Sequence, residues 1–569
     1  MTTVVVVREP GADGLARVVA GLRESDPGPV AVVAGDLVIA DAALAPITAD
    51  EYASTGLLVR ASLDQADVRV RHHVVMSVGS ALHDVSAPDH RFVGAFVVAD
   101  RDREVAATAI EAARDVVSND IDATQAAAVG LVRAGIVCRA IELVDVPWYR
   151  DPDDPIEAKQ QVDRIPADRI AQLQANRLDD GFYSTFVIRK MSKPMTRLAL
   201  RLGLSPNTIT LASFAIGLGA AGFFALGERW ALVVGAVLLQ LSITVDCVDG
   251  EVARATRKFS TLGAWLDAST DRVKEYVAYA GLAFGAQQVL GLNLWPLAIV
   301  MMVLQTVRHM TDYDFSRVQR SREARVEPRP FTDRSDGAEQ SSGGWSVAGA
   351  MEMSSRVNAR SAVRWAKRAI HMPIGERWLV ISVFAAFLGA AWALGALLVL
   401  GVVALAYVTV GRVLRTLTWR GAAPEDAAQL LARQADSGVI AAMIGRLLPV
   451  GRWGDRWAWA FPAALRLVEL GLVAAIGLFV YPDALVLAFW WVAIIAFHHY
   501  DVLYRAIQGQ AVPPWLTAAG LGWDGRTIIV IICAAAGLAW FSGLMSIGIA
   551  VWSLLLIVIA SAQWLRSMQ

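Results

Sequence analysis

The feature that most constrains this chain is a series of long apolar stretches in its last two thirds. About ten such stretches lie between Thr208 and Leu565, and most have the roughly 20 residues that a helix needs to cross a lipid bilayer. With 55% hydrophobic residues, 18% charged residues and a mean hydropathy of +0.45, the chain is too apolar for a soluble protein of its length. The sequence therefore predicts a multi-pass α-helical membrane protein. The expected spans are 208–226, 230–248, 262–286, 294–310, 378–394, 396–414, 463–480, 484–501, 527–540 and 546–565.

Charges between the expected spans are unevenly distributed. The connections at one end, such as 226–230 and 480–484, carry few charges, whereas those at the other end hold Arg254, Arg412 and Arg505. Because Lys and Arg accumulate on the cytoplasmic side of membrane proteins, we expect both termini to be cytoplasmic, in a plasma-membrane protein.

Residues 1–178 have a different composition from the rest of the chain. Short Val-rich runs, such as 30–33, alternate with helical stretches rich in Ala, Arg and Glu, a pattern typical of an α/β domain. We therefore expect a cytosolic domain at 1–178, a membrane domain at 179–420 with a cytosolic insertion at 314–370, and a second membrane domain of four helices at 421–569.

Charge and cysteine content exclude some classes of protein. The 52 Lys and Arg against 53 Asp and Glu give a net charge of −1, so no global field favours nucleic acid as a partner. The three cysteines are scattered, which argues against a disulfide framework or a thiolate zinc site.

Four carboxylates converge on one short cytoplasmic connection. Asp246 and Asp249 lie where the second span ends, and Asp267 and Asp271 lie early in the third; residues three or four apart share one helix face. Ionised groups at membrane depth are costly, so this cluster calls for metal ions as counter-charge. Oxygen-only ligands suit Mg²⁺ or Mn²⁺ rather than zinc. We therefore predict a divalent metal site, although helix-end acids can also cluster by chance.

Small residues and one cation accompany these acids. Gly250, Ala253 and Gly263 leave room for a substrate beside the backbone, although small residues also permit close helix packing in lipid. The guanidinium of Arg254 can bind phosphate oxygens.

These residues form the pattern D(x2)DG(x2)AR(x8)G(x3)D(x3)D, which resembles the signature of the CDP-alcohol phosphotransferase family. The likeness covers roughly residues 179–415 and implies a six-helix core, often dimeric, whose active site opens to the cytoplasm. It implies that Asp246, Asp249 and Asp267 hold two divalent ions on the CDP diphosphate. It also implies that Asp271 helps to hold metal and acts as general base on the acceptor hydroxyl. The CDP-binding set that it implies is Asp249, Gly250, Ala253, Arg254 and Gly263.

Two further segments narrow the resemblance. Residues 179–210 and the PIGERW sequence at 373–378 look most like di-myo-inositol phosphate phosphate synthases, which are often fused to a cytidylyltransferase domain. Residues 33–46 and 146–158 resemble parts of such a nucleotidyltransferase-like domain, but its glycine-rich nucleotide loop is absent near the N-terminus. We therefore expect an inactive domain that binds or scaffolds, with Asp36 as a relic of a metal site.

Acceptor recognition is less defined by the sequence. Lys274, Arg308, Arg377 and Arg412 lie at helix ends where they can bind an acceptor phosphate, although charge topology explains each of them equally well. In the last third of the chain, polar residues around His498, His499 and Asp501 suggest metal binding, proton transfer or, as the favoured interpretation, a structural cluster.

The sequence thus favours a membrane enzyme that moves a substituted phosphate from a CDP-linked alcohol, similar to CDP-inositol, to an acceptor alcohol or polyol phosphate and releases CMP. The alternative enzyme is a phospholipid synthase that uses CDP-diacylglycerol as donor and inositol phosphate or glycerol phosphate as acceptor. A transporter is the alternative of another class, but its charges are expected along a path through the membrane rather than at one face. A scaffold with a dead site is disfavoured because all four carboxylates are present.

Overall fold

The structure is a computed structural model that describes residues 2–48, 54–62, 65–71, 73–143, 145–174, 181–256, 258, 260–323, 328–336, 370–419, 421–438, 455–507 and 520–567. The chain divides into two compact units. The first comprises Met1–Asn176 with Gln319–Ser342, and the second comprises Arg177–Val318 with Gly343–Gln569.

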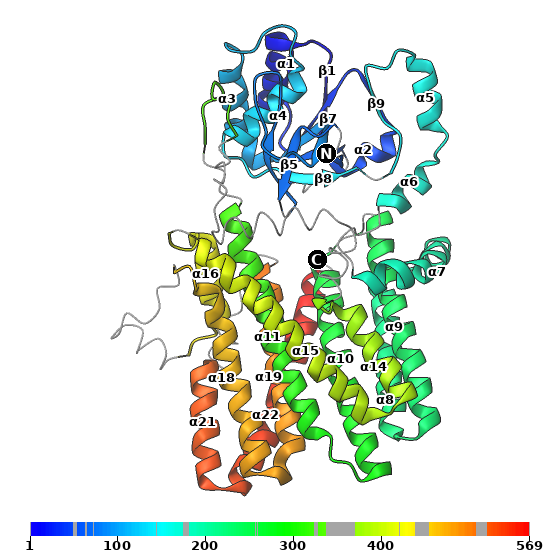
Figure 1. Cartoon of the computed structure of the whole chain (residues 1–569), viewed down its shortest axis with the longest axis vertical. Helices are drawn as coiled ribbons and strands as arrows, with labels where there is room; N and C mark the ends of the chain where they lie inside the picture. Colours follow the sequence, from blue (N-terminus) through cyan, green and yellow to red (C-terminus); the bar gives the residue numbers. More distant parts are fainter. Residues whose placement is uncertain are drawn as a thin grey trace. The chain divides into compact units, whose positions relative to one another are not determined.

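The first unit is an α/β domain built on a seven-stranded mixed sheet in the order β1-β2-β7-β4-β8-β6-β5 (Figure 1). Strands β3 (Leu37–Val38) and β9 (Tyr149–Arg150) form a separate antiparallel ribbon. The main strands are β1 Thr3–Val7, β2 Val30–Ala34, β4 Gly56–Ala61, β5 Val68–Arg71, β6 Val74–Val78, β7 His90–Val98 and β8 Arg139–Glu142. The helices are α1 Gly11–Glu24, α2 Asp41–Thr48, α3 Arg103–Ala113, α4 Ala123–Arg133, α5 Pro155–Asp163 and α6 Ala167–Gln174.

Alternation along the central strand gives this sheet two apolar faces. In β7, Phe96 and Val98 belong to the core that contains α1, α3 and α4, whereas Ala95 and Val97 belong to the core that contains α2 and α6. Successive side chains of a strand point to opposite faces, so each face buries its own set. The expected α/β class of this region is confirmed.

Part of the expected insertion packs on this first unit. The Arg69 side chain donates to Asp336 at 2.7 Å, the amide of Arg329 donates to the carbonyl of Arg133 at 2.8 Å, and His83 contacts the ring of Phe331. Residues 314–323 form the end of a helix, and 337–369 lie outside the described residues. The segment 328–336 is therefore a component of the α/β domain rather than a free loop.

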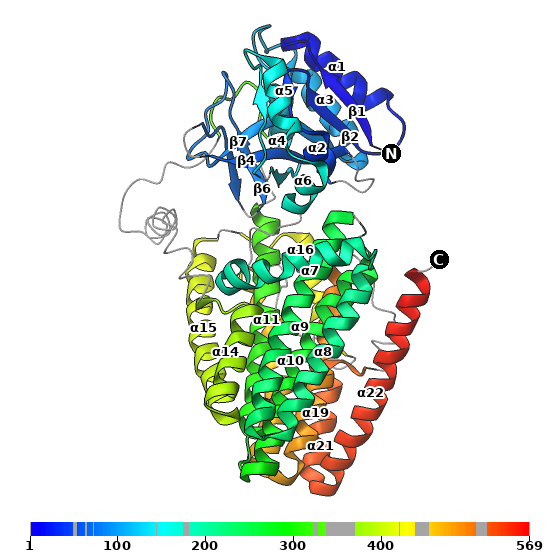
Figure 2. The same cartoon turned by 90° about the vertical axis from the view of Figure 1, so that its right-hand side faces the viewer.

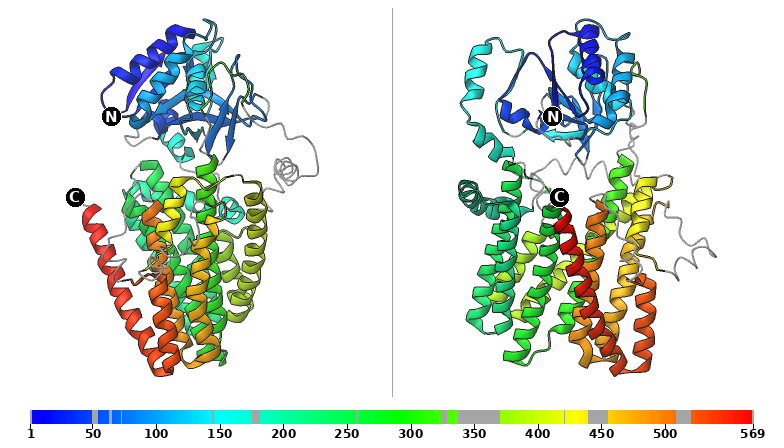
Figure 3. Two further views of the ribbon diagram at one scale, coloured as in Figure 1. Left: turned by 90° about the vertical axis from the view of Figure 1, so that its left-hand side faces the viewer. Right: turned by 180° about the vertical axis from the view of Figure 1, so that it is seen from behind.

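The second unit is a helical bundle, in which α7 lies across one end (Figure 2) and α22 runs obliquely beside α19 (Figure 3). Its helices are α7 Arg189–Arg201, α8 Pro206–Leu226, α9 Arg229–Thr256, α10 Thr261–Leu290, α11 Trp295–Glu323, α14 Ile374–Phe387, α15 Ala390–Thr418, α16 Glu425–Gln434, α18 Phe461–Ala475, α19 Leu485–Ile507, α21 Gly522–Ala536 and α22 Leu538–Ser567.

Six segments of the described residues are long and apolar enough to span a membrane, so the expected multi-pass class is confirmed. They are Pro206–Leu226, Arg229–Thr256, Ala390–Thr418, Ala458–Val480, Pro482–Ile507 and Leu538–Leu556. The other four expected spans fall on α10, α11, α14 and α21. Helix α10 carries five charged residues between Asp267 and Glu275, while α14 and α21 have only 14 and 15 residues.

Two expected boundaries are wrong. The span expected at 378–394 crosses a break at Gly389, and the span expected at 527–540 crosses a break at Gly537. These glycines have φ angles of +99° and +116°, which other residues rarely adopt. The helix therefore stops and restarts inside a continuous apolar run.

Candidate active site

Three of the four predicted carboxylates come together from α9 and α10, and the fourth lies one helical turn away. One oxygen each of Asp246, Asp267 and Asp271 lies within 4.8 Å of the others. Asp249, one turn beyond Asp246, is 6% exposed and accepts a hydrogen bond from Thr210 of α8. Carboxylate oxygens this close together repel one another unless a cation or proton lies between them. The donor set is all oxygen, which fits Mg²⁺ or Mn²⁺.

Lys274 lies at the base of this cluster and is fully buried. Its Nζ is 2.6 Å from Asp246 and 2.9 Å from Asp271, and it donates to Ser213 of α8 at 3.0 Å. The sequence suggested Lys274 as an acceptor-binding residue, whereas the structure places it as an internal counter-charge. One ammonium can balance only one of the four carboxylates, so the others call for a metal ion or protons.

Helix α8 contributes residues that the motif did not reveal. Thr210, Ser213 and Gly217 lie three and four residues apart, so they share one face of the helix. A Cβ on Gly217 would lie 2.7 Å from Cγ and Cδ of Lys274, so the glycine gives the lysine its path to the carboxylates. Two hydroxyls and a glycine at helical spacing in a mostly apolar span are the sequence signal that could have identified α8 as the third helix of the site.

The motif glycines lie beside polar side chains. A Cβ on Gly250 would lie 3.0 Å from Nη1 of Arg254, and a Cβ on Gly263 would lie 2.8 Å from Oδ1 of Asn207. Ala253, on the same turn of α9, is partly buried. Asn207 lies in the first turn of α8, whose N-cap is Ser205; the side chain of Ser205 accepts from the amide of Thr208.

The three arginines expected to bind the acceptor have different surroundings. Nε and Nη2 of Arg377 donate to the two oxygens of Glu275, at 2.8 and 3.1 Å. Arg412 bonds to Asp312. Arg308 donates to the carbonyls of two residues, 371 and 372. Among the described residues, Nε and Nη1 of Arg308 and Nη1 of Arg412 have no hydrogen-bond partner.

The polar residues of the last third form a buried network. Arg466 and Arg526 both bind Glu469, at 2.7 and 2.6 Å, and His499 lies 2.9 Å from the same carboxylate. Arg526 also binds Asp436, at 2.7 Å. Asp436, His498 and His499 have the proximity of a metal site, but two guanidinium groups already balance the two carboxylates. This arrangement favours the structural interpretation over metal binding.

In the α/β domain, a guanidinium occupies the neighbourhood of Asp36. Arg150 binds both oxygens of Asp36, at 2.9 and 3.0 Å, and also binds Asp122 at 2.6 Å. Burial alone would raise the pKa of Asp122, but Arg150 and Thr124 lower it, so this carboxylate is held ionised. An adjoining cavity of about 390 Å³ is lined by residues 60–62, Arg91 and residues 148–150.

Comparison with known proteins identifies two segments. Residues 204–327 match the family described as CDP-alcohol phosphatidyltransferase, and residues 453–568 match a family of unknown function, DUF5941. The second match covers most of the extra membrane helices expected after residue 421.

Several characterised proteins are similar to part of the chain. Phosphatidylinositol phosphate synthase of Mycolicibacterium smegmatis is 32% identical over 133 residues, which are 23% of this chain and 58% of the relative. A bifunctional IPC transferase and DIPP synthase of Thermococcus kodakarensis is 26% identical over 250 residues, 44% of this chain and 51% of the relative. The corresponding protein of Rubrobacter xylanophilus is 36% identical over 147 residues, 26% of this chain and 31% of the relative.

The chain thus spans less than two thirds of the length of these relatives. The matched segment of the family nevertheless contains all four carboxylates, Lys274 and the small residues of the motif. Residues 204–327 of this membrane protein are therefore a CDP-alcohol phosphatidyltransferase domain.

Proposed function

We propose that this protein transfers a substituted phosphate from a CDP-linked alcohol to an acceptor alcohol and releases CMP. The observation that carries the proposal is the convergence of Asp246, Asp267 and Asp271 within 4.8 Å, next to the buried Asp249. Such a cluster with one internal lysine provides a binding place for cations and, through them, for a diphosphate.

Each group of residues at the site has its own proposed role in the reaction. Two divalent ions, held by Asp246, Asp249, Asp267 and Asp271, would neutralise the diphosphate and stabilise the leaving CMP. Arg254 lies against Gly250, where its guanidinium can bind a phosphate oxygen. Asp271 accepts the proton of the attacking hydroxyl, and the ammonium of Lys274 at 2.9 Å orients this carboxylate.

The donor is proposed to be polar and similar to CDP-inositol. The relatives named IPC transferase and DIPP synthase support this choice, whereas the relative named phosphatidylinositol phosphate synthase supports the alternative donor CDP-diacylglycerol. The test is CMP release by the purified full chain in detergent with Mg²⁺ or Mn²⁺, with each donor offered separately over a pool of polyol phosphates and lipid extract. Release from CDP-inositol supports the proposal, and release only from CDP-diacylglycerol favours the phospholipid synthase.

Asp271→Asn tests the role of Asp271 in this assay, because asparagine is nearly isosteric with aspartate and cannot accept the proton. We expect it to abolish turnover while nucleotide binding persists. CMP release by this variant at the wild-type rate would contradict the role of Asp271 as general base.

Arg308 and Arg412 are the first candidates for binding an acceptor phosphate. Their guanidinium groups keep nitrogens without a hydrogen-bond partner among the described residues, whereas Arg377 is fully engaged with Glu275 and a backbone carbonyl. Lys274 instead forms ion pairs with Asp246 and Asp271.

For the α/β domain, we propose a role in binding or scaffolding without synthesis of the CDP-alcohol. The guanidinium of Arg150 already neutralises Asp36, and a divalent ion would have to displace it. The expected result is that the full chain releases no pyrophosphate from CTP and inositol phosphate; release that depends on Asp36 would overturn this proposal.

The orientation and assembly are proposed from the sequence. We propose a plasma-membrane homodimer with both termini and the active site cytoplasmic, because basic residues gather at that side of the bundle. Proteolysis of sealed vesicles tests the orientation, and light scattering of the detergent complex tests the dimer.

A further inference from the structure

The helix that carries Asp267 and Asp271 has a second polar face. Asp267, Asp271 and Lys274 lie four and three residues apart and form the face toward the candidate active site. Trp265 and Arg272 lie on the opposite face of α10, together with Tyr276 and Tyr279. This opposite face packs on α19, which belongs to the segment 453–568.

Two polar contacts connect α19 to this opposite face. The indole nitrogen of Trp265 donates to Oδ1 of Asp501 at 2.7 Å, and the other oxygen of Asp501 accepts from Arg505 at 2.9 Å. Two helical turns past Trp265, the guanidinium of Arg272 lies over the ring of Tyr500, 5.7 Å from its centre. Asp501 is 1% exposed and Tyr500 is fully buried, so water does not compete for either contact.

Further bonds hold Arg272 in place. Its Nη1 donates to Glu275 at 3.0 Å and to Nδ1 of His309 on α11 at 2.8 Å, and the hydroxyl of Tyr500 lies 3.2 Å from the same nitrogen of His309. Arg272 directly follows Asp271 in the chain. The carboxylate and the C-terminal segment are therefore connected through consecutive residues of one helix.

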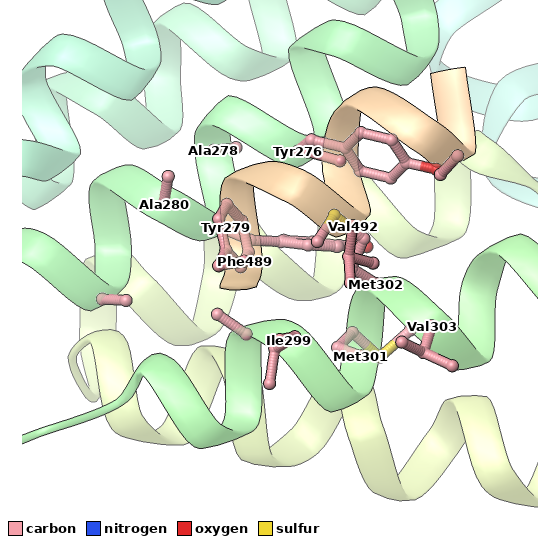
Figure 4. Close-up of a cluster of buried hydrophobic side chains, with 14 of the residues drawn as sticks. Tyr276, Ala278, Tyr279, Ala280, Ile299, Met301, Met302, Val303, Phe489 and Val492 are labelled. Atoms are coloured by element: carbon pink, nitrogen blue, oxygen red, sulfur yellow. The ribbon is translucent and has the colours of Figure 1, made fainter. Parts of the chain in front are cut away.

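Apolar packing continues the same contact along the helix. Phe489 and Val492 of α19 lie beside Tyr279 of α10 and Met302 of α11 (Figure 4). The polar contacts of Trp265 and Arg272 lie near the start of α10, where the carboxylates are, and the apolar contacts lie further along. Directional polar contacts restrict the rotation of a helix and its position along its axis more narrowly than apolar packing does. The contacts of Trp265 and Arg272 can therefore set the orientation of α10, whereas the apolar contacts mainly add packing.

We propose that α19 positions the catalytic helix, with Asp501 and Tyr500 fixing the rotation of α10 that brings Asp267 and Asp271 toward Asp246. This gives the segment of the family of unknown function a role as a structural part of the active site. The inference rests on the proposed function in taking these carboxylates as the metal-binding groups.

The test compares variants of the purified full chain. Trp265→Phe keeps an aromatic ring and removes the donor, and Trp540→Phe is the matched control, because Trp540 is 66% exposed. The readouts are the Mn²⁺ concentration at half-saturation, measured by electron paramagnetic resonance, and the hydrogen exchange of residues 261–272 in metal-free protein. Loss of a buried hydrogen bond to a charged group predicts a rise of roughly ten- to a hundredfold in the Mn²⁺ concentration at half-saturation for Trp265→Phe, together with faster exchange.

A second pair of variants covers the case in which Trp265→Phe fails to fold. Asp501→Asn retains the Oδ1 acceptor and should bind Mn²⁺ more tightly than Asp501→Ala, and Tyr500→Phe should give a smaller loss than Asp501→Ala. The proposal is overturned if folded Trp265→Phe matches Trp540→Phe in both readouts, or if Asp501→Asn and Asp501→Ala are equal. Absence of CMP release by a wild-type protein that binds Mn²⁺ would overturn the proposed function and leave this inference intact.

Discussion

Removal of the ammonium of Lys274 tests whether this lysine is the counter-charge that stabilises the carboxylate cluster. In Lys274→Met, Asp246 and Asp271 lose the cation that now lies 2.6 and 2.9 Å from them, and a methionine of similar length fills the path over Gly217. Breaking a buried ion pair by removing one partner costs about 3–5 kcal/mol. We therefore expect the metal-free variant to be destabilised by about that amount.

Divalent metal should reverse most of this loss. An ion that binds only the folded state adds stability that grows with its concentration, about 4 kcal/mol at a thousand times its dissociation constant. Mn²⁺ replaces the missing positive charge between the carboxylates, so the variant should gain more from Mn²⁺ than the wild type does. Even with Mn²⁺, turnover by Lys274→Met should remain roughly 10²-fold or more below that of the wild type, because Asp271 has lost the group that orients it.

The assay is unfolding of the purified protein in detergent, with chelator and with Mn²⁺, for the wild type, Lys274→Met and Lys193→Met. Lys193 is exposed on α7, so the same substitution there controls for the loss of one lysine. If metal-free Lys274→Met unfolds together with the wild type, the lysine is not the counter-charge of the cluster and the reasoning is refuted.

Three further predictions concern other parts of the protein. Gly217→Ala should lower turnover at least severalfold, because its Cβ would clash with the buried lysine, whereas Gly222→Ala on the same helix meets no atom within 4 Å and should be neutral. Arg308→Met should raise KM for the acceptor about tenfold or more, with less effect on kcat. Arg415→Met, at a partly exposed residue near the end of α15, should change neither KM nor kcat. Equal effects of the two substitutions on KM would exclude a role of Arg308 in acceptor binding. Burial alone would lower the pKa of His90, but its two acidic neighbours raise it to about 9, so the charged histidine stabilises the α/β domain fully below pH 6.5 and this stabilisation is lost as the pH rises toward 9. Hydrogen exchange of β7, corrected for intrinsic rates, should show that loss in the wild type, and an equal loss in His90→Gln would contradict it.

The sequence predicted the carboxylate site because its geometry is local. Asp246 and Asp249 share one helix, Asp267 and Asp271 share the next, and a short connection brings the two helix ends together, so spacing alone predicts their proximity. The apolar runs predicted helices for the same reason. The breaks at Gly389 and Gly537 were missed because hydropathy averages over a window and does not report the backbone conformation of one glycine.

The remaining parts of the site depend on contacts between residues distant in the chain. Nothing near Lys274 in the sequence indicates that Gly217, 57 residues earlier, opens its path to the carboxylates, and nothing near Trp265 indicates Asp501. Charged residues at helix ends satisfy the positive-inside pattern whether they bind a substrate or an internal carboxylate, so composition could not separate Arg308 from Arg377. The structure separates them by one criterion, namely whether the guanidinium nitrogens already have partners. For these two residues the criterion connects the chemistry to the fold: Arg377 donates to Glu275 of α10 and to a backbone carbonyl and so holds its helix in place, whereas Arg308 keeps two nitrogens that phosphate oxygens can use.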